Sequence, residues 1–377
     1  IYTNNGKYYY VRYLSTEITL PFDVTYPPAQ ENGWTGSGTE ADPYQVATVA
    51  DLFAIADAVN SAEIPEGAKK VTTFNGVHFK QTKAINLKGY QFTPIGGNDD
   101  MYRFGGIYDG DNKTISYLTV NTGSKGYAAL FGAADTLSVI KNVSLSSPDI
   151  TVDSYYYAGG VVAYGAGHVE NCKVTNGNIK GALIVGGVCG SSGPATKLSF
   201  TGKVQGTSNI GGVIGNMRYP ATFLSATNTE VTCFGGQDSY SAGGVIGYLT
   251  NSSLSGNTGG YLADSYFSGK VIMCKGGIYA GGVSGISVGA PVSRCFSIGE
   301  ITNTATVSSS AIGGVVGAIQ STLIEDCFFA GNLEVPSQWA GSIAGYCINV
   351  QTQSGVTHSE IKNCYVTGHS RSTSNYS

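Results

Sequence analysis

The chain has 377 residues and a formal net charge of −4 at pH 7; only 12% of its residues are charged, whereas 54 are glycine. It contains no basic block, which disfavours nucleic acid as a partner, because proteins that bind nucleic acid neutralise phosphates with clustered Lys and Arg. No apolar run approaches the roughly 18 residues that a membrane-spanning helix needs, so no such segment is predicted.

The N-terminal part contains one predicted helix. Residues 1–32 are rich in tyrosine and alternate enough to form strands, but they share no repeat with the rest of the chain, so their place in the fold stays open. Thr48 and Asp51 resemble a capping box, and helical spacing follows at Val49, Leu52, Phe53, Ala56 and Val59. We expect an amphipathic helix near 48–61 that covers one end of a stack of strands.

Two short-strand segments follow this helix. They occupy 74–97 and 104–120, with Asp-Gly and Asp-Asn turns, and are predicted to be the first coils of the stack. Acidic residues cluster here, with Asp99 and Asp100 near Arg103 in one loop and Asp109 near Asp111 in another. We interpret both clusters as solvated turns, in which Asp is favoured, rather than as carboxylate sites.

A Gly-Gly phrase recurs through the second half of the chain. Five strict copies, such as VGGVCG at 185–190, and two looser copies have their first glycine at positions 159, 186, 211, 243, 281, 313 and 341. Each unit supplies only two or three short β-branched segments, too few for a propeller blade, so each is predicted to be one coil of a parallel β-helix. The glycines indicate a crowded corner or a positive φ.

A second phrase aligns three further columns. The first is expected to be a buried ladder of unpaired thiols, because Leu and Ser occupy the same position: Cys172, Leu198, Ser225, Ser265, Cys295, Cys327, Cys364. The preceding column, which should face solvent and carry an ion-pair ladder at 264, 294 and 326, is Asn171, Lys197, Leu224, Asp264, Arg294, Asp326, Asn363. The column two past the phrase's glycine is Ile179, Val204, Val231, Val271, Ile301, Leu333, Ser370. No CxxC pair or HExxH motif occurs, so we expect no metal and no cofactor.

Aromatic residues give the candidate site. The column two residues before each Gly-Gly phrase contains Tyr157, Tyr279 and Trp339, and Tyr240 lies one place earlier in its own unit. Aromatic faces bind sugar rings by apolar stacking, so these four residues form a candidate ligand-binding stripe. The alternative, that they only cover the core beside a corner, stays open at this point.

The order of motifs resembles one known family. The motifs are WTGSGTEADPY at 34–44, DLFAIADAVN at 51–60, FGGIYDG at 104–110, LFG at 130–132 and then the repeated GGVxG with NC. Over about 32–370 this order is similar to the GLUG-repeat proteins, which are bacterial surface and secreted adhesin-like proteins with a pectin-lyase-like β-helix. The repeat also accompanies the catalytic domain of IgA-cleaving metallopeptidases, whose zinc motif is missing here.

The resemblance implies an all-β fold, a single-stranded right-handed parallel β-helix with an N-terminal amphipathic capping helix. The expected organisation is a Tyr-rich segment at 1–32, the capping helix and first coils at 33–145, the Gly-Gly coils at 146–370 and a polar tail at 371–377.

For function, we expect a non-enzymatic bacterial cell-surface or secreted adhesin-like binding or spacer module without catalytic residues. Its expected partners are an extracellular glycan or a host surface protein, and it is expected to be a monomer. One alternative is a polysaccharide lyase or glycoside hydrolase on the same scaffold, which would need clustered carboxylates. Another is the non-catalytic repeat region of a larger surface protein, such as an IgA-protease-like peptidase.

Overall fold

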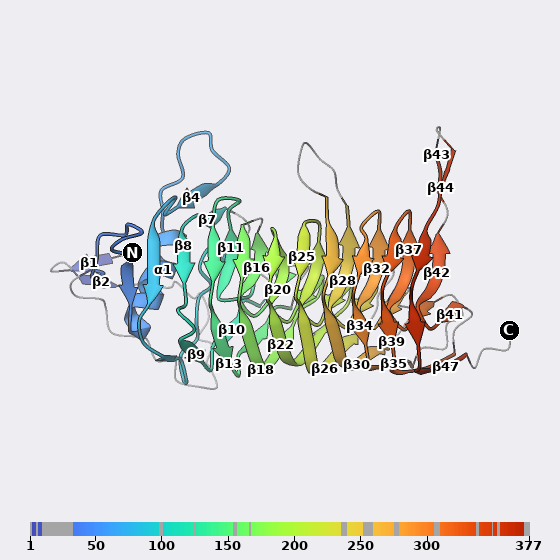
Figure 1. Ribbon diagram of the computed structural model, residues 1–377. Helices are drawn as coiled ribbons and strands as arrows, with labels where there is room; N and C mark the ends of the chain where they lie inside the picture. The colour runs from blue at the N-terminus through green and yellow to red at the C-terminus, as the bar shows by residue number, and fades with distance from the viewer. Residues whose placement is uncertain are drawn as a thin grey trace.

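The computed structural model describes residues 2–4, 7–9, 33–97, 101–123, 126–153, 157–165, 167–234, 240–251, 259–274, 279–304, 310–336, 339–348, 350–352 and 355–372. From residue 33 onward they form one elongated stack of coils, with the helix at one end and the C-terminal strands at the other (Figure 1). Four parallel sheets run along the stack, and each complete coil adds a strand to sheets I, II, III and IV in that order. The fold is the predicted parallel β-helix.

Sheets I and II lie on either side of the Gly-Gly corner. Sheet I has seven strands: β15 (Tyr157–Ala158), β19 (Ile184–Gly186), β23 (Asn209–Gly211), β27 (Ser241–Gly243), β31 (Tyr279–Gly281), β36 (Ala311–Gly313) and β41 (Trp339–Gly341). Sheet II has ten: β4 (Val71–Thr73), β7 (Tyr102–Phe104), β11 (Phe131–Ala134), β16 (Val162–Gly165), β20 (Cys189–Ser192), β24 (Ile214–Met217), β28 (Ile246–Thr250), β32 (Ser284–Val288), β37 (Val316–Gln320) and β42 (Ala344–Ile348).

Sheet III has eleven strands: β3 (Tyr44–Val46), β5 (His78–Gln81), β8 (Ile107–Asp109), β12 (Val139–Lys141), β17 (His168–Glu170), β21 (Ala195–Thr196), β25 (Pro220–Thr222), β29 (Tyr261–Ala263), β33 (Val292–Ser293), β38 (Leu323–Glu325) and β45 (Glu360–Lys362).

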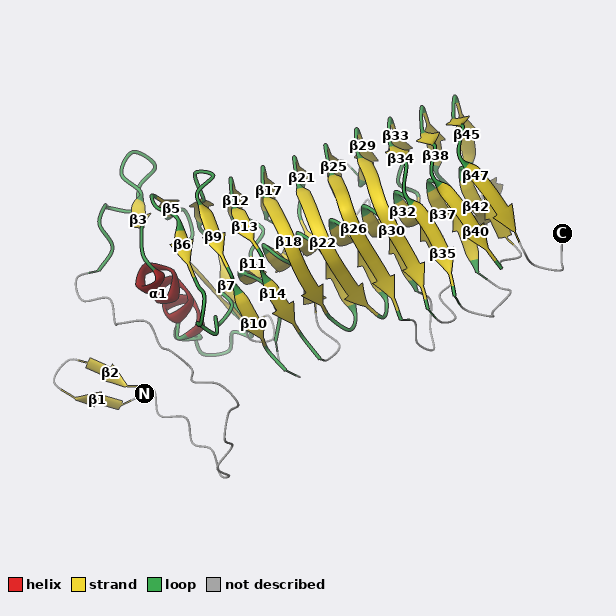
Figure 2. Cartoon of the chain, turned by 90° about the horizontal axis from the view of Figure 1, so that it is seen from below, coloured by secondary structure: helices red, strands yellow, loops and turns green. Residues whose placement is uncertain are grey.

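Sheet IV has fifteen strands, and its long members lie side by side in Figure 2. They are β6 (Ile85–Asn86), β9 (Thr114–Ser116), β10 (Thr119–Asn121), β13 (Ser144–Ser146), β14 (Asp149–Thr151), β18 (Lys173–Lys180), β22 (Ser199–Gly206), β26 (Ser225–Cys233), β30 (Tyr266–Met273), β34 (Phe296–Ser297), β35 (Glu300–Asn303), β39 (Phe328–Phe329), β40 (Asn332–Val335), β46 (Tyr365–Val366) and β47 (His369–Ser372). Two antiparallel pairs stand outside the four sheets: β1 (Tyr2–Asn4) with β2 (Lys7–Tyr9), and β43 (Val350–Thr352) with β44 (Gly355–Thr357).

The helix α1 (Val49–Asn60) covers the N-terminal end of the stack, as predicted (Figures 1 and 2). Its capping box is formed, because the Thr48 side chain accepts from the Asp51 N–H and the Asp51 carboxylate accepts from the Thr48 N–H. The helix buries Leu52, Ile55, Ala56 and Val59 against the first coils. The otherwise open end of the stack is therefore closed at this side.

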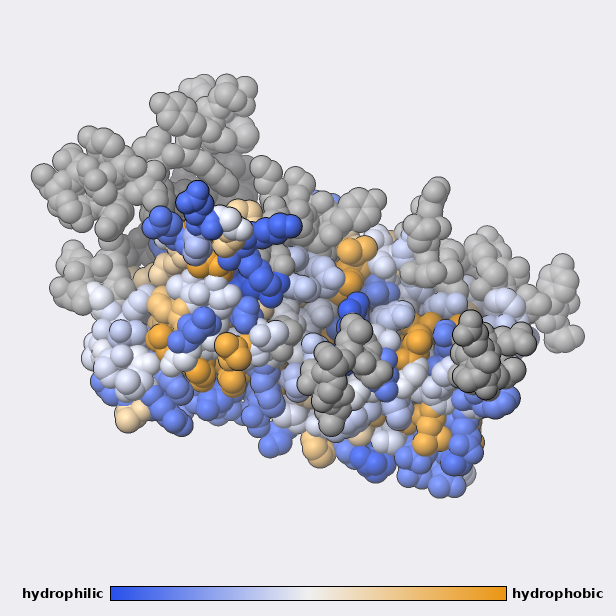
Figure 3. Space-filling view, turned by 90° about the horizontal axis from the view of Figure 1, so that it is seen from above, coloured by the Kyte–Doolittle hydropathy of each residue, from blue (hydrophilic) through white to orange (hydrophobic). Residues whose placement is uncertain are grey.

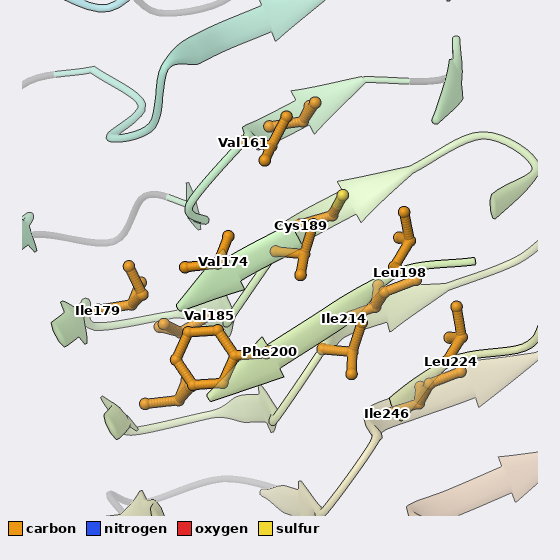
Figure 4. Close-up of a cluster of buried hydrophobic side chains, with 14 of the residues drawn as sticks. Val161, Val174, Ile179, Val185, Cys189, Leu198, Phe200, Ile214, Leu224 and Ile246 are labelled. Carbon is orange, nitrogen blue, oxygen red and sulfur yellow. The ribbon is translucent and has the colours of Figure 1, made fainter. Parts of the chain in front are cut away.

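The core is a single column of apolar side chains between the sheets, part of which is drawn in Figure 4. The Gly-Gly phrase is required by close approach. A Cβ on Gly186 would meet the Cys189 carbonyl oxygen at 1.9 Å, and one on Gly187 would lie 2.4 Å from the Phe200 ring. Neither glycine has a positive φ. Of the two reasons predicted for the phrase, crowding at the corner is confirmed.

Positive φ instead belongs to the turn before sheet IV. The residues with φ near +50° there are Asn171, Lys197, Phe223, Asp264, Arg294, Asp326 and Asn363. The predicted column agrees in six units, but the unit at 224 was wrong by one residue. Leu224 is buried in the thiol column, Phe223 is 56% exposed, and Ser225 pairs with Ser199 in sheet IV. The cause is a bulge between Thr227 and Thr229, which gives β26 one residue more than the two strands that pair with it, β22 and β30.

The thiol column otherwise forms as predicted. None of the eight cysteines, all of which lie in the described residues, forms a disulfide, and Cys172, Cys189, Cys233, Cys295 and Cys327 are buried. Burial is the main cause that raises the pKa of the Cys172 thiol to about 12. Cys172, Cys295 and Cys327 act as small apolar side chains in the wall between sheets III and IV, whereas Cys189 lies in sheet II and Cys233 at the end of β26.

Two acidic clusters differ in their outcome. Asp109 accepts hydrogen bonds from the Asp111 N–H and the Asn142 amide, so it stabilises a turn as interpreted from the sequence. Arg103, however, was wrongly placed in a loop: it belongs to β7, is 8% exposed and lies 3.9 Å from an Asp135 carboxylate oxygen. Asp99 and Asp100 lie outside the described residues.

Candidate binding site

The aromatic column of sheet I has the predicted register. Cα pairing connects Tyr157, Ile184, Asn209, Ser241, Tyr279, Ala311 and Trp339 in successive coils. The residue after each of them points inward and is buried or packed against the core. Strand alternation therefore directs this column outward.

A second outward column runs beside it in sheet II. It contains Tyr164, Ser191, Asn216, Tyr248, Ile286, Ala318 and Tyr346, each seven residues after its neighbour in sheet I. We call the surface made by these two columns the I–II face. Sequence reasoning missed the sheet II column, because its residue type changes at every coil. The constant spacing of seven, which joins Tyr157 to Tyr164 and Trp339 to Tyr346, was the available signal.

The I–II face contains a pocket of about 380 Å³, which we call the central pocket. Sheet I and the residue before β27 supply Asn209, Tyr240, Ser241 and Tyr279, and sheet II supplies Tyr248, Ile286, Val288, Gln320 and Ile348. Two of the four predicted site residues, Tyr240 and Tyr279, thus line one pocket. They also meet through the backbone, since the Tyr279 N–H donates to the Tyr240 carbonyl at 3.1 Å.

The other two predicted residues lie on the same face outside this pocket. The Trp339 and Tyr346 rings have centroids 4.8 Å apart, and both Trp339 and Tyr279 pack against the buried cluster of Ile286, Ala311 and Ala318. Tyr157 belongs to a separate cluster, in which its ring contacts Tyr127 and Tyr164 at centroid distances of 5.7 and 5.1 Å. The stripe is therefore divided into aromatic groups rather than continuous.

Polar groups of the central pocket are suited to hydrogen bonding. The Ser241 hydroxyl donates to the Asn209 amide oxygen at 2.9 Å, which orients that amide. Burial, followed by the charge of Tyr346, raises the pKa of Tyr279, so its hydroxyl remains a donor at neutral pH. The described residues that line the pocket include no carboxylate, imidazole or amine. This arrangement can stack on a ligand and hydrogen-bond to it.

Metal-ligating side chains and surface charges do not form a second candidate site among the described residues. Among the described residues, no group of three or more His, Cys, Asp or Glu side chains is placed to hold a metal ion. Of the ion-pair ladder predicted at 264, 294 and 326, one pair forms among the described residues: Arg294 donates two hydrogen bonds of 2.7 and 2.8 Å to the Asp264 carboxylate on the outer surface, so these two charges neutralise each other. Nor, within the described parts of the chain, is any helix long and apolar enough to cross a membrane.

Figure 3 shows the surface on the side opposite to the long strands of sheet IV seen in Figure 2. There apolar side chains reach the surface in separate patches between hydrophilic areas. These separate patches do not merge into one large hydrophobic interface on this side of the molecule.

Comparisons with known proteins agree with the repeat. The model of the GLUG motif matches residues 154–180. Halomucin of Haloquadratum walsbyi is 31% identical over 198 residues, which are 52% of this chain and 2% of halomucin. A protein of Evansella cellulosilytica named "Putative Gly-rich membrane protein" is 26% identical over 149 residues, which are 38% of this chain and 15% of that protein. The chain thus spans only a small fraction of the length of these relatives.

Two solved structures show similarity at low identity. A Bacteroides ovatus protein described as a "putative immunoglobulin A1 protease" aligns with a TM-score of 0.42 and 18% identity, over 88% of this chain and 77% of that one. A structure named IgA1 Protease aligns with a TM-score of 0.45 and 13% identity, over 86% of this chain and 21% of that one. The chain thus contains a GLUG motif at residues 154–180, within coils that stack as a parallel β-helix.

Proposed function

We propose that this chain is a non-enzymatic module of an extracellular or cell-surface protein, which binds glycans on its I–II face and acts as an extended spacer. The observation that carries the proposal is the central pocket. Three tyrosines, Tyr240, Tyr248 and Tyr279, line it together with an oriented amide at Asn209. Aromatic side chains together with a few polar groups of fixed orientation are typical of a carbohydrate-binding site.

The shape supports the spacer part of the proposal. A β-helix grows by one coil per repeat, so its length follows the number of repeats. Tyr157 and Trp339 are separated by six strand-to-strand steps, about 29 Å at about 4.8 Å per step. A face of this length accommodates a polymer better than a single sugar. The name of the Evansella relative, a membrane protein, is compatible with a surface location.

A glycan array followed by titration of the best ligand tests the proposal. Each stacked ring contributes about 1 kcal/mol, so Tyr279→Ala and Tyr248→Ala should each weaken binding about fivefold. Both side chains are only partly buried and lie outside the main core, so the variants should still fold. The matched control is Tyr261→Ala, which removes a 36% exposed tyrosine from β29 in sheet III, away from the I–II face. It should bind as tightly as the native chain.

Two results would contradict the proposal. Absence of binding to every glycan on the array removes the binding function. Release of reducing or unsaturated sugar from a bound polysaccharide would show an enzyme in place of a binding module.

A further inference from the structure

Charge is distributed unequally between the faces of the β-helix. In sheet I, the strands from β15 to β41 contain no Asp, Glu, Lys, Arg or His, and neither do the sheet II strands from β11 to β42. Sheet IV carries the ion pairs instead: Lys203 with Glu230, Lys270 with Glu300 and Arg371 with Glu334. The described strands of the I–II face therefore carry no charged side chain over the Gly-Gly coils, whereas sheet IV does; Arg103 of β7, which lies over the Tyr164 ring at the edge of this face, is itself paired with Asp135.

A buried amide adds an unused hydrogen-bond acceptor to this neutral face. Asn216 is 8% exposed, and its Oδ1 atom has no hydrogen-bond partner among the described residues. It pairs in register with Tyr248, which lines the central pocket, and lies seven residues after Asn209, which also lines it. Buried amide oxygens are nearly always satisfied, so an unpaired one beside a pocket points to a donor supplied by a ligand.

From this neutrality and this acceptor we infer that the ligand is an uncharged polysaccharide, which lies along the coil axis and donates a hydroxyl to Asn216. The inference rests on the function proposed above and names its ligand class. Sugar hydroxyls both donate and accept, so they match the Asn209 and Gln320 amides that line the pocket and the Asn216 carbonyl, which lies on the strand next to Tyr248.

A charged polymer is disfavoured by the same observations. A carboxylate, sulfate or ammonium that enters this pocket loses part of its hydration, and the described residues of the I–II face provide no opposite charge in return. The cost of burying a ligand charge without an opposite charge contributes to specificity as much as the favourable contacts of a neutral ligand do. The charges of sheet IV at Lys203, Glu230, Lys270 and Glu300 are paired with one another and lie outside the I–II face.

Affinity electrophoresis with soluble polymers tests the inference on the whole chain. The neutral probes are hydroxyethylcellulose, arabinoxylan and galactomannan, the acidic probes are polygalacturonate and hyaluronan, and the basic probe is chitosan. We expect retardation by at least one neutral polymer only, with a Kd that changes less than twofold between 50 and 500 mM NaCl, because no ion pair is formed. Affinity should rise from a disaccharide to a hexasaccharide of the same polymer.

The variant Asn216→Leu separates a ligand contact from a structural role. Because the Oδ1 atom has no partner in the protein, an apolar side chain of similar size should keep the urea midpoint of unfolding while weakening binding at least threefold. Binding restricted to acidic or basic polymers would overturn the neutral ligand and leave the glycan-binding function standing. Unchanged binding by Asn216→Leu would overturn the role of Asn216. Failure to bind any polymer would remove the proposed function itself.

Discussion

Gly187 shows how one residue position shapes the corner between sheets I and II. A Cβ atom there would lie 2.2 Å from the Gly212 carbonyl oxygen in the next coil and 2.4 Å from the Phe200 ring. The same corner in later coils meets Phe267 at Gly244 and Phe329 at Gly314. The second glycine of the phrase therefore provides room both for the neighbouring backbone and for a large core side chain.

The variant Gly187→Ala should lower the free energy of unfolding by about 3 kcal/mol, at the upper end of overpacking effects, because the opposing carbonyl is held in its sheet. Urea unfolding measures the change. Lys173→Ala, which truncates an exposed side chain of β18, is the control and should stay within about 0.5 kcal/mol of the native chain. Equal stability of Gly187→Ala would show that the corner relaxes freely.

At the scale of elements, α1 covers apolar surface at the end of the stack, and the thiol column fills apolar space inside it. The helix lays four buried side chains across the first coils and starts at a formed capping box. The thiol column fills the wall between sheets III and IV, where Leu198, Leu224 and Ser265 take the place of cysteine. Both features depend on side-chain size and position rather than on reactivity.

Removal of the cap should loosen the helix without altering the sheets. Thr48→Ala should destabilise the chain by about 1 kcal/mol, because the Asp51 N–H at the first turn loses its acceptor. Thermal unfolding followed by circular dichroism measures this loss. The control Glu63→Ala changes an exposed side chain just after the helix and should have no effect. An equal effect of both variants would contradict the role of the cap.

Thiol reactivity should follow burial. The pKa of Cys172 is raised to about 12, so at pH 8 only about one thiol in 10⁴ is the reactive thiolate, and burial also excludes the reagent. Burial, and after it the hydrogen bond with the Cys327 thiol, raises the pKa of Cys295. The same hydrogen bond lowers the pKa of Cys327, so the protection of Cys327 rests on its burial. In the native chain at pH 8, iodoacetamide should label the exposed Cys347 first, and Cys172, Cys189, Cys233, Cys295 and Cys327 only after unfolding.

The pH dependence of Cys172 has a defined sign. Its folded pKa lies above the ordinary value of 9.0, so its contribution to stability is complete below pH 9 and is lost as the pH rises toward 12. Mass spectrometry of labelled peptides checks the order of reaction. Rapid labelling of Cys172 in the folded chain would contradict the buried column, and four disulfides found without reductant would replace it.

At the scale of the whole molecule, the sequence predicts those parts of the fold in which the same packing contacts recur from coil to coil. The Gly-Gly phrase and the column from Ile179 to Leu333 were readable because the same contacts recur in every coil. Ser225 was misplaced because a bulge leaves no compositional mark. Tyr248 and Asn216 were missed because an outward column is free to vary, so only its spacing is kept. Arg103 was wrongly predicted to lie in a loop because the sequence around it does not show that it pairs with Asp135 in a later coil.

The two ends of the stack differ, which leads to the last prediction. At the N-terminal end α1 covers the first coils, whereas β41, β42, β45 and β46 each pair with a strand of the described residues on one side only. Core positions of this last coil are correspondingly accessible, with Ile361 46% exposed and Val366 only partly buried. Because each coil is stabilised mainly by its neighbours, the last coil should open more readily than the others.

Hydrogen exchange read by mass spectrometry measures this opening. Peptides that cover β45–β47 should exchange at least about tenfold faster than those that cover β22, after correction for intrinsic rates. Peptides from β3 and β4, the end strands that contact α1, should resemble β22, because the helix replaces a missing neighbour at that end. The variant Leu52→Ala, which truncates a buried side chain of α1, should speed the exchange of the strands beneath the helix and leave the exchange of β22 and β45–β47 unchanged. Equal exchange at the two ends of the stack would contradict stabilisation by neighbouring coils, since α1 covers one end, whereas the strand edges at the other end pair with no strand of the described residues.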